Sequence, residues 1–187
     1  KPPKPNRILV TGVGKTGSTA LFHAILNALP PDTRTLFEPE SRGDTLPENI
    51  SEPVLVKSFI PYSENFNFFE KKILLVRDPR DQLISELLYR PFRVISGKPE
   101  ENNENLIDTF LDLVRRKESS PDTVSFRELF DTLPVGVPAR LNFMMNYASG
   151  HPEALFFKYE DFIDEKLKRL NRFLGFNIEG SIEVPGK

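Results

Sequence analysis

Short apolar runs alternate with amphipathic stretches along most of this chain. Runs of apolar and β-branched residues between turn residues predict strands, whereas apolar residues spaced three and four apart predict helices. The expected strands cover residues 8–11, 33–38, 53–59, 71–78 and 153–161. The expected helices cover residues 17–29, 79–89, 106–114, 124–133, 138–148 and 164–175. This alternation predicts an α/β fold of three layers, in which helices flank a central parallel sheet.

Two of the expected helices carry local signals at their ends. Asp78 followed by Pro79 suits a helix start, with Asp78 as the N-cap and Pro79 at the first helical position. Pro91 predicts that this helix ends near Tyr89, because proline has no N–H to donate to the preceding turn. Gly175 is placed to cap the C-terminus of the last helix.

Composition places the chain among ordinary globular proteins. A length of 187 residues predicts a single domain over residues 1–187 with a proper core. The net charge of −2 argues against a protein that binds nucleic acid through bulk basicity. The absence of cysteine excludes disulfides, thiol nucleophiles and cysteine metal sites, and the two histidines lie far apart. We therefore expect no metal site.

Neither a membrane span nor a signal peptide is expected within the chain. No apolar stretch approaches the roughly 18 residues needed to cross a bilayer. The opening "KPPKPN" is polar and rich in proline, which predicts a linker over residues 1–6. The default expectation is a cytoplasmic location, and the alternative is the lumen of the secretory pathway if an anchor precedes this segment.

The segment "GVGKTGST" at residues 12–19 joins the first expected strand to the first expected helix. A nucleoside triphosphate loop would carry a glycine five residues before Gly14, but Leu9 stands there, so the strict Walker A pattern fails. Unpaired N–H groups and the helix dipole still favour an anion at this turn. A tight turn with hydroxyl caps would explain the glycines but not Lys15, so we favour anion binding.

A second polar segment, "RDPRDQLIS", follows the fourth expected strand. Arg77 lies at the carboxyl end of that strand, which is where open α/β sheets bind ligands. Ser85 lies eight residues later, to one side of the apolar stripe of the following helix. Taken alone, this segment is better explained as a helix start with a surface arginine.

The two segments together resemble the sulfotransferase family, whose members use 3′-phosphoadenosine 5′-phosphosulfate (PAPS). The segment "FFKYEDF" and the helix that follows it also resemble that family, so the similarity spans residues 8–176. It implies a P-loop-like fold. "GSTAL", with Ala20 where cytosolic members carry tryptophan, is similar to the carbohydrate-type and bacterial branches.

The resemblance assigns a nucleotide role to eight residues. The residues implied on the 5′-phosphosulfate side are Lys15, Thr16, Gly17, Ser18 and Thr19. Arg77 and Ser85 are implied at the 3′-phosphate, and Tyr159 lies near the adenine. The family also carries an R-K-G loop over the 3′-phosphate, and we expect that loop to lie after residue 187.

Sulfonate transfer needs a group that meets the leaving phosphate and a base that takes the acceptor proton. The resemblance implies Lys15 for the first role. The stretch 57–61 matches the family's K-T-H-L-P, but Phe59 replaces the histidine base. Heparan-type members use a glutamate instead, which implies Glu38 in "TLFEPE", with Glu40 in reserve. The alternative for Glu38 is a solvated loop carboxylate.

Four other polar features have simpler readings. His23 flanks an apolar helix stripe and is expected to be structural or surface-exposed, and His151 lies in a loop without an obvious partner. The basic run at 166–172 has leucines at helical spacing, which indicates a solvated helix face. Lys57 ends a strand and needs no function, but its match to the family favours one.

We therefore predict a sulfotransferase that moves a sulfonate from PAPS to a hydroxyl, in preference to an amine. The expected acceptor is a carbohydrate, a lipid or a small molecule. One rival is a P-loop kinase or NTPase, which would bind ATP and Mg²⁺. The other rival is a sulfotransferase-like module that binds the nucleotide without turnover, which Phe59 would allow.

Overall fold

The computed structural model of the protein describes residues 7–42, 52–59, 67–96, 104–132 and 138–178. The predicted linker at residues 1–6, the Ile60–Pro61 end of the K-T-H-L-P match and the chain after residue 178 lie outside the described residues. Within the described part, no helix has both the length and the apolar character needed to cross a bilayer.

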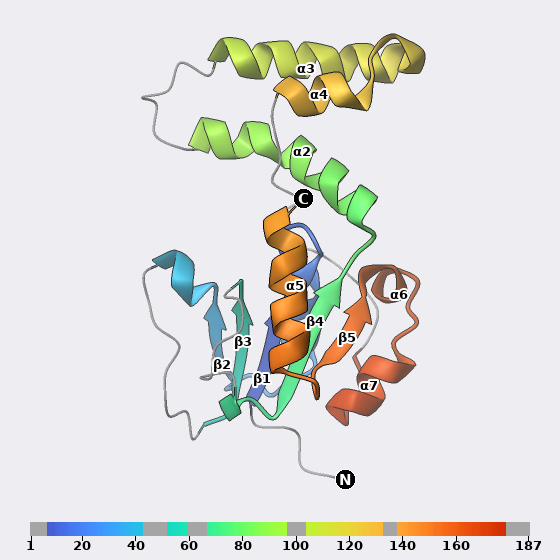
Figure 1. Cartoon of the computed structure of the whole chain (residues 1–187). Helices are drawn as coiled ribbons and strands as arrows, with labels where there is room; N and C mark the ends of the chain where they lie inside the picture. Colours follow the sequence, from blue (N-terminus) through green and yellow to red (C-terminus); the bar gives the residue numbers. More distant parts are fainter. Residues whose placement is uncertain (1–6, 43–51, 60–66, 97–103, 133–137, 179–187) are drawn as a thin grey trace. The chain divides into compact units, whose positions relative to one another are not determined.

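Five strands form one parallel sheet in the order β2-β3-β1-β4-β5 (Figure 1). The strands are β1 (Arg7–Thr11), β2 (Arg34–Phe37), β3 (Val54–Ser58), β4 (Lys71–Val76) and β5 (Leu155–Lys158). Their register pairs Thr11 with Ser58 and Leu74, and Val76 with Lys158. The three central strands are nearly continuous apolar runs, as expected for a parallel sheet that is covered on both faces.

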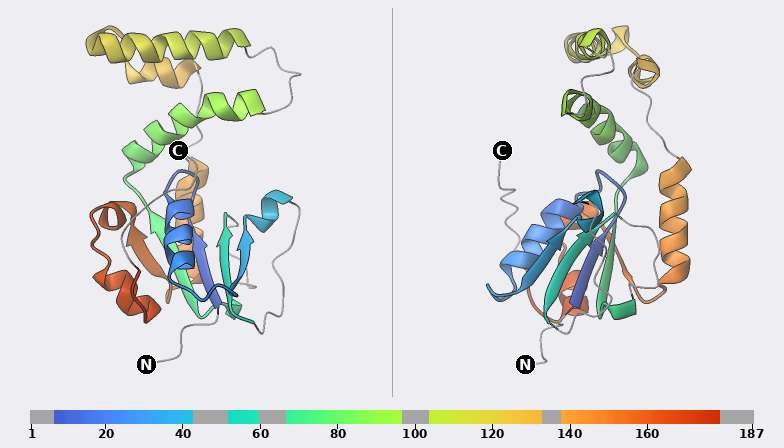
Figure 2. Two further views of the ribbon diagram at one scale, coloured as in Figure 1. Left: turned by 180° about the vertical axis from the view of Figure 1, so that it is seen from behind. Right: turned by 90° about the vertical axis from the view of Figure 1, so that its left-hand side faces the viewer.

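Helices cover both faces of this sheet, which confirms the three-layer α/β prediction (Figure 2). On one face, α1 (Ser18–Asn27), α6 (Tyr159–Ile163) and α7 (Lys168–Leu174) pack on inward-facing strand residues. On the other face, α5 (Pro138–Gly150) buries Tyr147 against the remaining strand residues. Alternation of side chains along each strand supplies both cores.

The chain divides into two compact units, which are described separately. The sheet unit comprises residues 1–77 and 138–187, and the helical unit comprises residues 78–137. The helical unit contains α2 (Pro79–Ser96), α3 (Glu104–Ser119), the 3₁₀ turn Pro121–Thr123 and α4 (Phe126–Thr132). Its small core consists of Leu87, Phe110, Val124 and Leu129.

Helix α2 begins as predicted but ends later than predicted. The Asp78 carboxylate accepts a hydrogen bond from the Arg80 N–H at 2.9 Å, as an N-cap does. The Arg80 guanidinium, together with that backbone hydrogen bond, lowers the pKa of Asp78 to about 2. The prediction that the helix ends near Tyr89 is wrong, because α2 continues through the buried Pro91. A helix absorbs an internal proline by bending, and α2 is bent in Figure 1.

The predicted strand over 153–161 is also wrong at its end, because β5 stops at Lys158 and α6 begins at Tyr159. Two acidic residues in the first turn of α6 favour a helix there. The next helix, predicted from residue 164, starts at Lys168, because Glu165 turns the chain with a φ of 56°. Gly175 caps that helix as predicted, with a φ of 81°.

Candidate active site

The carboxyl ends of all five strands meet at one edge of the sheet, and each is followed or ended by a predicted site residue. Lys15 follows β1, Glu38 follows β2, Lys57 lies near the end of β3, Arg77 follows β4 and Tyr159 follows β5. Parallel α/β sheets bind their ligands at this edge, next to the point where the strand order reverses. In this sheet that position lies at the central strand β1.

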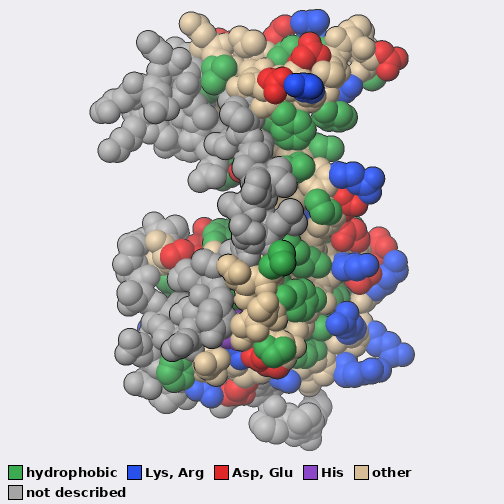
Figure 3. All heavy atoms as spheres, in the orientation of Figure 1, with side chains coloured by type: hydrophobic (Ala, Val, Ile, Leu, Met, Phe, Trp, Pro, Cys, Tyr) green, Lys and Arg blue, Asp and Glu red, His purple; other side chains and the backbone are tan. Residues whose placement is uncertain are grey.

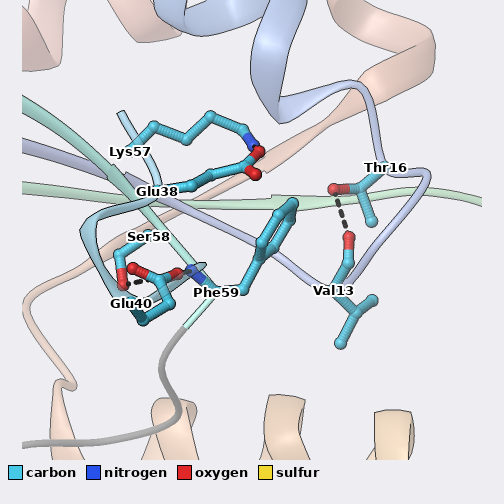
Figure 4. Close-up of polar contacts among 7 residues, drawn as sticks. All are labelled: Val13, Thr16, Glu38, Glu40, Lys57, Ser58 and Phe59. Atoms are coloured by element: carbon cyan, nitrogen blue, oxygen red, sulfur yellow. Dashed lines mark hydrogen bonds and ion pairs between the residues drawn. The ribbon is translucent and has the colours of Figure 1, made fainter. Parts of the chain in front are cut away.

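The loop after β1 is compact and is closed by a hydrogen bond between two of its own residues. The Thr16 hydroxyl donates a hydrogen bond to the Val13 carbonyl at 2.9 Å, and Thr16 is fully buried (Figure 4). A Cβ added at Gly12 would lie 2.6 Å from that hydroxyl and 2.8 Å from the Leu75 carbonyl. Only glycine allows this approach, so Gly12 serves packing. The proton of the Thr16 hydroxyl is already used within the loop.

The N-terminus of α1 is open to an anion. Gly17 occupies the N-cap position with a φ of 86°, no side chain caps the helix, and its first turn has no acidic residue. Ser18 is buried at the first helical position and Thr19 is half-buried. Lys15 itself has a left-handed backbone with a φ of 66°. The first N–H groups and the helix dipole therefore favour a negatively charged ligand.

Arg77 lies against this loop. Its Nη1 donates a hydrogen bond to the Lys15 carbonyl at 3.2 Å, and its guanidinium carbon lies 4.5 Å from the centre of the Tyr159 ring. Its Nε is buried and has no hydrogen-bond partner among the described residues. A buried guanidinium N–H without an acceptor is costly, so this donor suits an anionic ligand.

Tyr159 completes the group by packing on the loop. A Cβ added at Gly17 would lie 2.4 Å from two carbons of the Tyr159 ring. The ring thus contacts the turn before α1 on one side and the Arg77 guanidinium on the other. The structure therefore brings together Lys15, Gly17, Arg77 and Tyr159, which are predicted from three separate segments.

A second group of charges lies at the ends of β2 and β3. Lys57 is fully buried, and its ammonium donates a hydrogen bond to the Glu38 carboxylate (Figure 4). The backbone reinforces the pair, because the Glu38 N–H donates to the Lys57 carbonyl at 2.8 Å. The ammonium also lies 4.6 Å from the Phe37 ring centre and 3.8 Å from that of Phe59. Burial lowers the pKa of Lys57, although Glu38 and Glu40 oppose this effect.

Glu40 holds the end of β3. Its Oε1 accepts a hydrogen bond from the Phe59 N–H and another from the Ser58 hydroxyl at 3.3 Å. Its Oε2 is buried and has no hydrogen-bond partner among the described residues. Two glutamates, Glu38 and Glu40, thus flank one lysine where the family resemblance implies a base.

Ser85 lies on α2, and its side chain is half-buried. It belongs to the helical unit, whereas Arg77 is the last residue of the first segment of the sheet unit. The structure therefore does not test the predicted pairing of Arg77 with Ser85.

His23 packs on aromatic rings, with its centroid 5.4 Å from Phe22 and 6.2 Å from Phe37. The expectation of a structural role fits this packing. The expectation that His151 lacks a partner is wrong, because the residue is fully buried, 5.1 Å from the Tyr147 ring and 3.5 Å from the Glu153 carboxylate. The turn after α5 folds this histidine inward.

The basic run at 166–172 forms a helix face, as predicted. Leu167 and Leu170 are buried, while Lys166, Lys168 and Arg172 are exposed. Basic side chains line the same part of the surface in Figure 3. Within the described residues, no cluster of three or more histidine, aspartate or glutamate side chains could hold a metal ion.

The individual residues of both groups could be identified from the sequence, but one contact within each group was missed. One is the hydrogen bond from Arg77 to the Lys15 backbone, and the other is the ion pair of Lys57 with Glu38. A signal existed for the second contact, since Lys57 is the only charge in the apolar run 54–59. A lysine buried in a strand needs an anionic partner. Parallel pairing places Phe37 beside Lys57, and the next residue along the chain is Glu38.

Comparison with known proteins identifies the fold. No model of a known protein family matches the chain, and no curated protein sequence matches it. Among solved structures, mouse sulfotransferase SULT7A1 complexed with PAP is 17% identical, with a TM-score of 0.54 over 93% of this chain. Retinol dehydratase, in complex with androsterone and the inactive cofactor PAP, is 18% identical, with a TM-score of 0.51 over 97% of this chain. The chain spans 59% and 63% of those two proteins, and the likeness shows that it has their fold.

Proposed function

We propose that this protein is a PAPS-dependent sulfotransferase. The observation that carries the proposal is the Arg77 guanidinium at the edge of the sheet. It donates a hydrogen bond to the Lys15 carbonyl, lies over the Tyr159 ring and keeps a buried donor without an acceptor among the described residues. Such a group suits a nucleotide with an anion at each end. Structures of the same fold that hold PAP support this choice.

In this proposal the donor nucleotide lies along the carboxyl ends of β1, β4 and β5. Backbone N–H groups of residues 15–19 and the Lys15 ammonium hold its 5′-phosphosulfate. Arg77 and Ser85 hold its 3′-phosphate, and Tyr159 lies near the adenine. Thr16 contributes its backbone N–H, because its hydroxyl is bonded to Val13.

The donor supplies the sulfonate group that is transferred. The acceptor oxygen forms a new S–O bond while the S–O bond to the 5′-phosphate breaks, and PAP leaves with that oxygen. The Lys15 ammonium stabilises the charge that develops on the leaving phosphate. The acceptor proton passes to a carboxylate of the protein, which we assign to Glu38.

The ion pair with Lys57 gives Glu38 a fixed orientation at the end of β2. The buried Lys57 ammonium therefore holds in place the carboxylate that takes the acceptor proton in this proposal. Phe59 cannot accept a proton, but its ring lies against the Lys57 ammonium and limits access of water to the pair.

A hydroxyl-bearing small molecule is the acceptor class that we propose first. The retinol dehydratase structure, which shares the fold, holds androsterone, an alcohol. The half-buried Phe37 and Phe59 rings beside Glu38 provide an apolar surface for such a molecule. Carbohydrates and lipids follow as acceptors to be assayed in the same series.

Thermal unfolding in the presence of PAP, AMP and ATP with Mg²⁺ tests the nucleotide assignment. A ligand at a hundredfold excess over its Kd raises the stability of the folded state by about 2.7 kcal/mol. We expect the largest stabilisation from PAP, in EDTA as well as in Mg²⁺. Stabilisation by ATP with Mg²⁺ alone would identify a kinase or NTPase and reject the proposal.

Sulfonation of an alcohol panel, assayed with labelled PAPS, tests turnover. Lys15→Ala should abolish the reaction and Glu38→Gln should lower its rate about 10²- to 10⁴-fold, while both proteins stay folded by circular dichroism. If the protein binds PAP but sulfonates no acceptor, it would instead be a sulfotransferase-like module that binds the nucleotide without turnover.

A further inference from the structure

We infer that Arg77 positions the Lys15 loop, in addition to the role proposed for it at the 3′-phosphate. This inference rests on the proposed function. It assigns one guanidinium to both ends of the donor nucleotide. Arg77 would act on the 5′ side without touching the 5′ group, by holding the backbone from which Lys15 extends.

The first support is the backbone of Lys15. Its φ of 66° lies in the left-handed region, which is unfavourable for any residue except glycine. Such conformations persist only where the surroundings hold them. The hydrogen bond from the Arg77 Nη1 reaches the carbonyl of this same residue at 3.2 Å. Arg77 therefore contacts the loop at its strained position.

The second support is that the Arg77 guanidinium is itself held in place. Its central carbon lies 4.5 Å from the centre of the Tyr159 ring, and that ring packs on Gly17 at the other end of the loop. Arg77, Tyr159 and the loop thus form a closed set of contacts from three strand ends. A lysine would keep the charge at this position but has neither the planar face nor the fork of donors.

The third support is the Nε of Arg77, which is buried and has no hydrogen-bond partner among the described residues. One donor of the guanidinium serves the loop, and this second donor suits the 3′-phosphate. The two functions use different atoms of a single rigid group, so they can be separated by experiment.

The test measures the affinity for AMP, which has the 5′-phosphate but no 3′-phosphate. We would titrate wild type, Arg77→Lys and Arg77→Met calorimetrically with AMP and with PAP. Loss of one charge-assisted hydrogen bond should weaken AMP binding about tenfold. Both variants should show this loss, although Arg77→Lys keeps the charge. PAP binding should weaken further.

Arg80→Met is the matched control, because the Arg80 side chain is 86% exposed and pairs with Asp78 outside the loop. It should leave the affinities for both nucleotides unchanged. A double-mutant cycle then shows whether Arg77 acts through Lys15. In a Lys15→Ala background, the effect of Arg77→Lys on AMP affinity should shrink to less than about twofold.

Hydrogen exchange of the 12–19 segment in the absence of nucleotide provides an independent readout. Exchange should be faster in Arg77→Lys than in wild type, and circular dichroism should confirm that both are folded. Unchanged AMP affinity and unchanged exchange in a folded Arg77→Lys that has lost PAP affinity would overturn the inference and leave the proposed function intact. Failure of the wild type to bind either nucleotide would instead reject the proposed function.

Discussion

Lys15 and Glu38, the two residues proposed for the chemistry, both have left-handed backbones, with φ of 66° and 48°. Each such residue costs about 1–2 kcal/mol relative to the right-handed region. Strain of this kind concentrates at functional sites, but Glu165 shows the same feature at an ordinary turn between helices. The strain supports the assignment only together with the charges around it.

Replacing Lys15 by glycine and by alanine separates the cost of its backbone from the role of its ammonium. Both variants lose the ammonium and should lose most of their affinity for PAP. Lys15→Gly also relieves the left-handed strain, so it should be more stable than Lys15→Ala by about 0.5–1 kcal/mol. Urea unfolding of the two variants measures this difference, and equal stabilities would show that the loop imposes no strain.

The buried Lys57 should make stability depend on pH in the alkaline range. Burial lowers its pKa in the folded protein, so the unfolded chain binds this proton more tightly. Stability therefore rises with pH between the folded value and the unfolded value of about 10.4. The free energy of unfolding of wild type, measured against Lys57→Met, should increase as the pH is raised toward the unfolded value of about 10.4. A flat or falling difference would contradict the burial argument.

Glu38 and Glu40 differ in what their carboxylates do, so their amide variants should differ too. Glu38→Gln removes the proposed base and should lower kcat about 10²- to 10⁴-fold. Glu40→Gln keeps an acceptor for the Phe59 N–H and should lower kcat much less. Steady-state sulfonation rates under saturating PAPS measure both variants. The opposite order would transfer the base role to Glu40.

At the scale of elements, the strands could be predicted better than the helix ends. The apolar runs at β1, β3 and β4 are buried on both faces, which leaves a strong signal in the sequence. The predicted ends were wrong at Pro91, through which α2 continues, and at Tyr159, where α6 begins. Both depend on packing and hydrogen bonds that local sequence patterns do not contain.

The site shows the same division between local and distant information. Lys15, Glu38 and Arg77 could be selected because each follows a strand and carries a charge. Their partners could not be selected, because contacts such as Arg77 with the Lys15 carbonyl depend on the order of strands in the sheet. Strand order is set by packing across the whole unit and leaves no local mark.

The turn before α1 offers a comparison of two glycines with the same backbone. Gly17 and Gly175 have φ of 86° and 81°, but a Cβ would meet Tyr159 at the first and open space at the second. Gly175→Ala should cost only the backbone term of about 1 kcal/mol. Gly17→Ala should cost more and should also abolish PAP binding, as chemical denaturation and calorimetry would measure. Equal costs at both positions would mean that Tyr159 moves aside freely.

At the scale of the whole molecule, the positive charge of the site comes from a few residues and not from the overall charge of the protein. The chain carries a net charge of −2, yet Lys15 and Arg77 lie together at one edge of the sheet. A strongly anionic nucleotide would therefore be attracted by the site itself and not by the overall charge of the protein. The Glu38 and Glu40 carboxylates lie at the ends of β2 and β3, on the opposite side of β1 from Arg77.

Because every strand end supplies one residue of the proposed site, the nucleotide binding that we propose would report on the completion of folding. The contacts of Arg77 with Lys15 and Tyr159 join positions that are 62 and 82 residues apart in the chain, and long-range pairings of this kind form slowly. After dilution from urea, α-helical circular dichroism should recover first. The capacity to bind PAP should recover only after β5 has paired with β4. The time at which PAP binding recovers would therefore date the last step of sheet assembly.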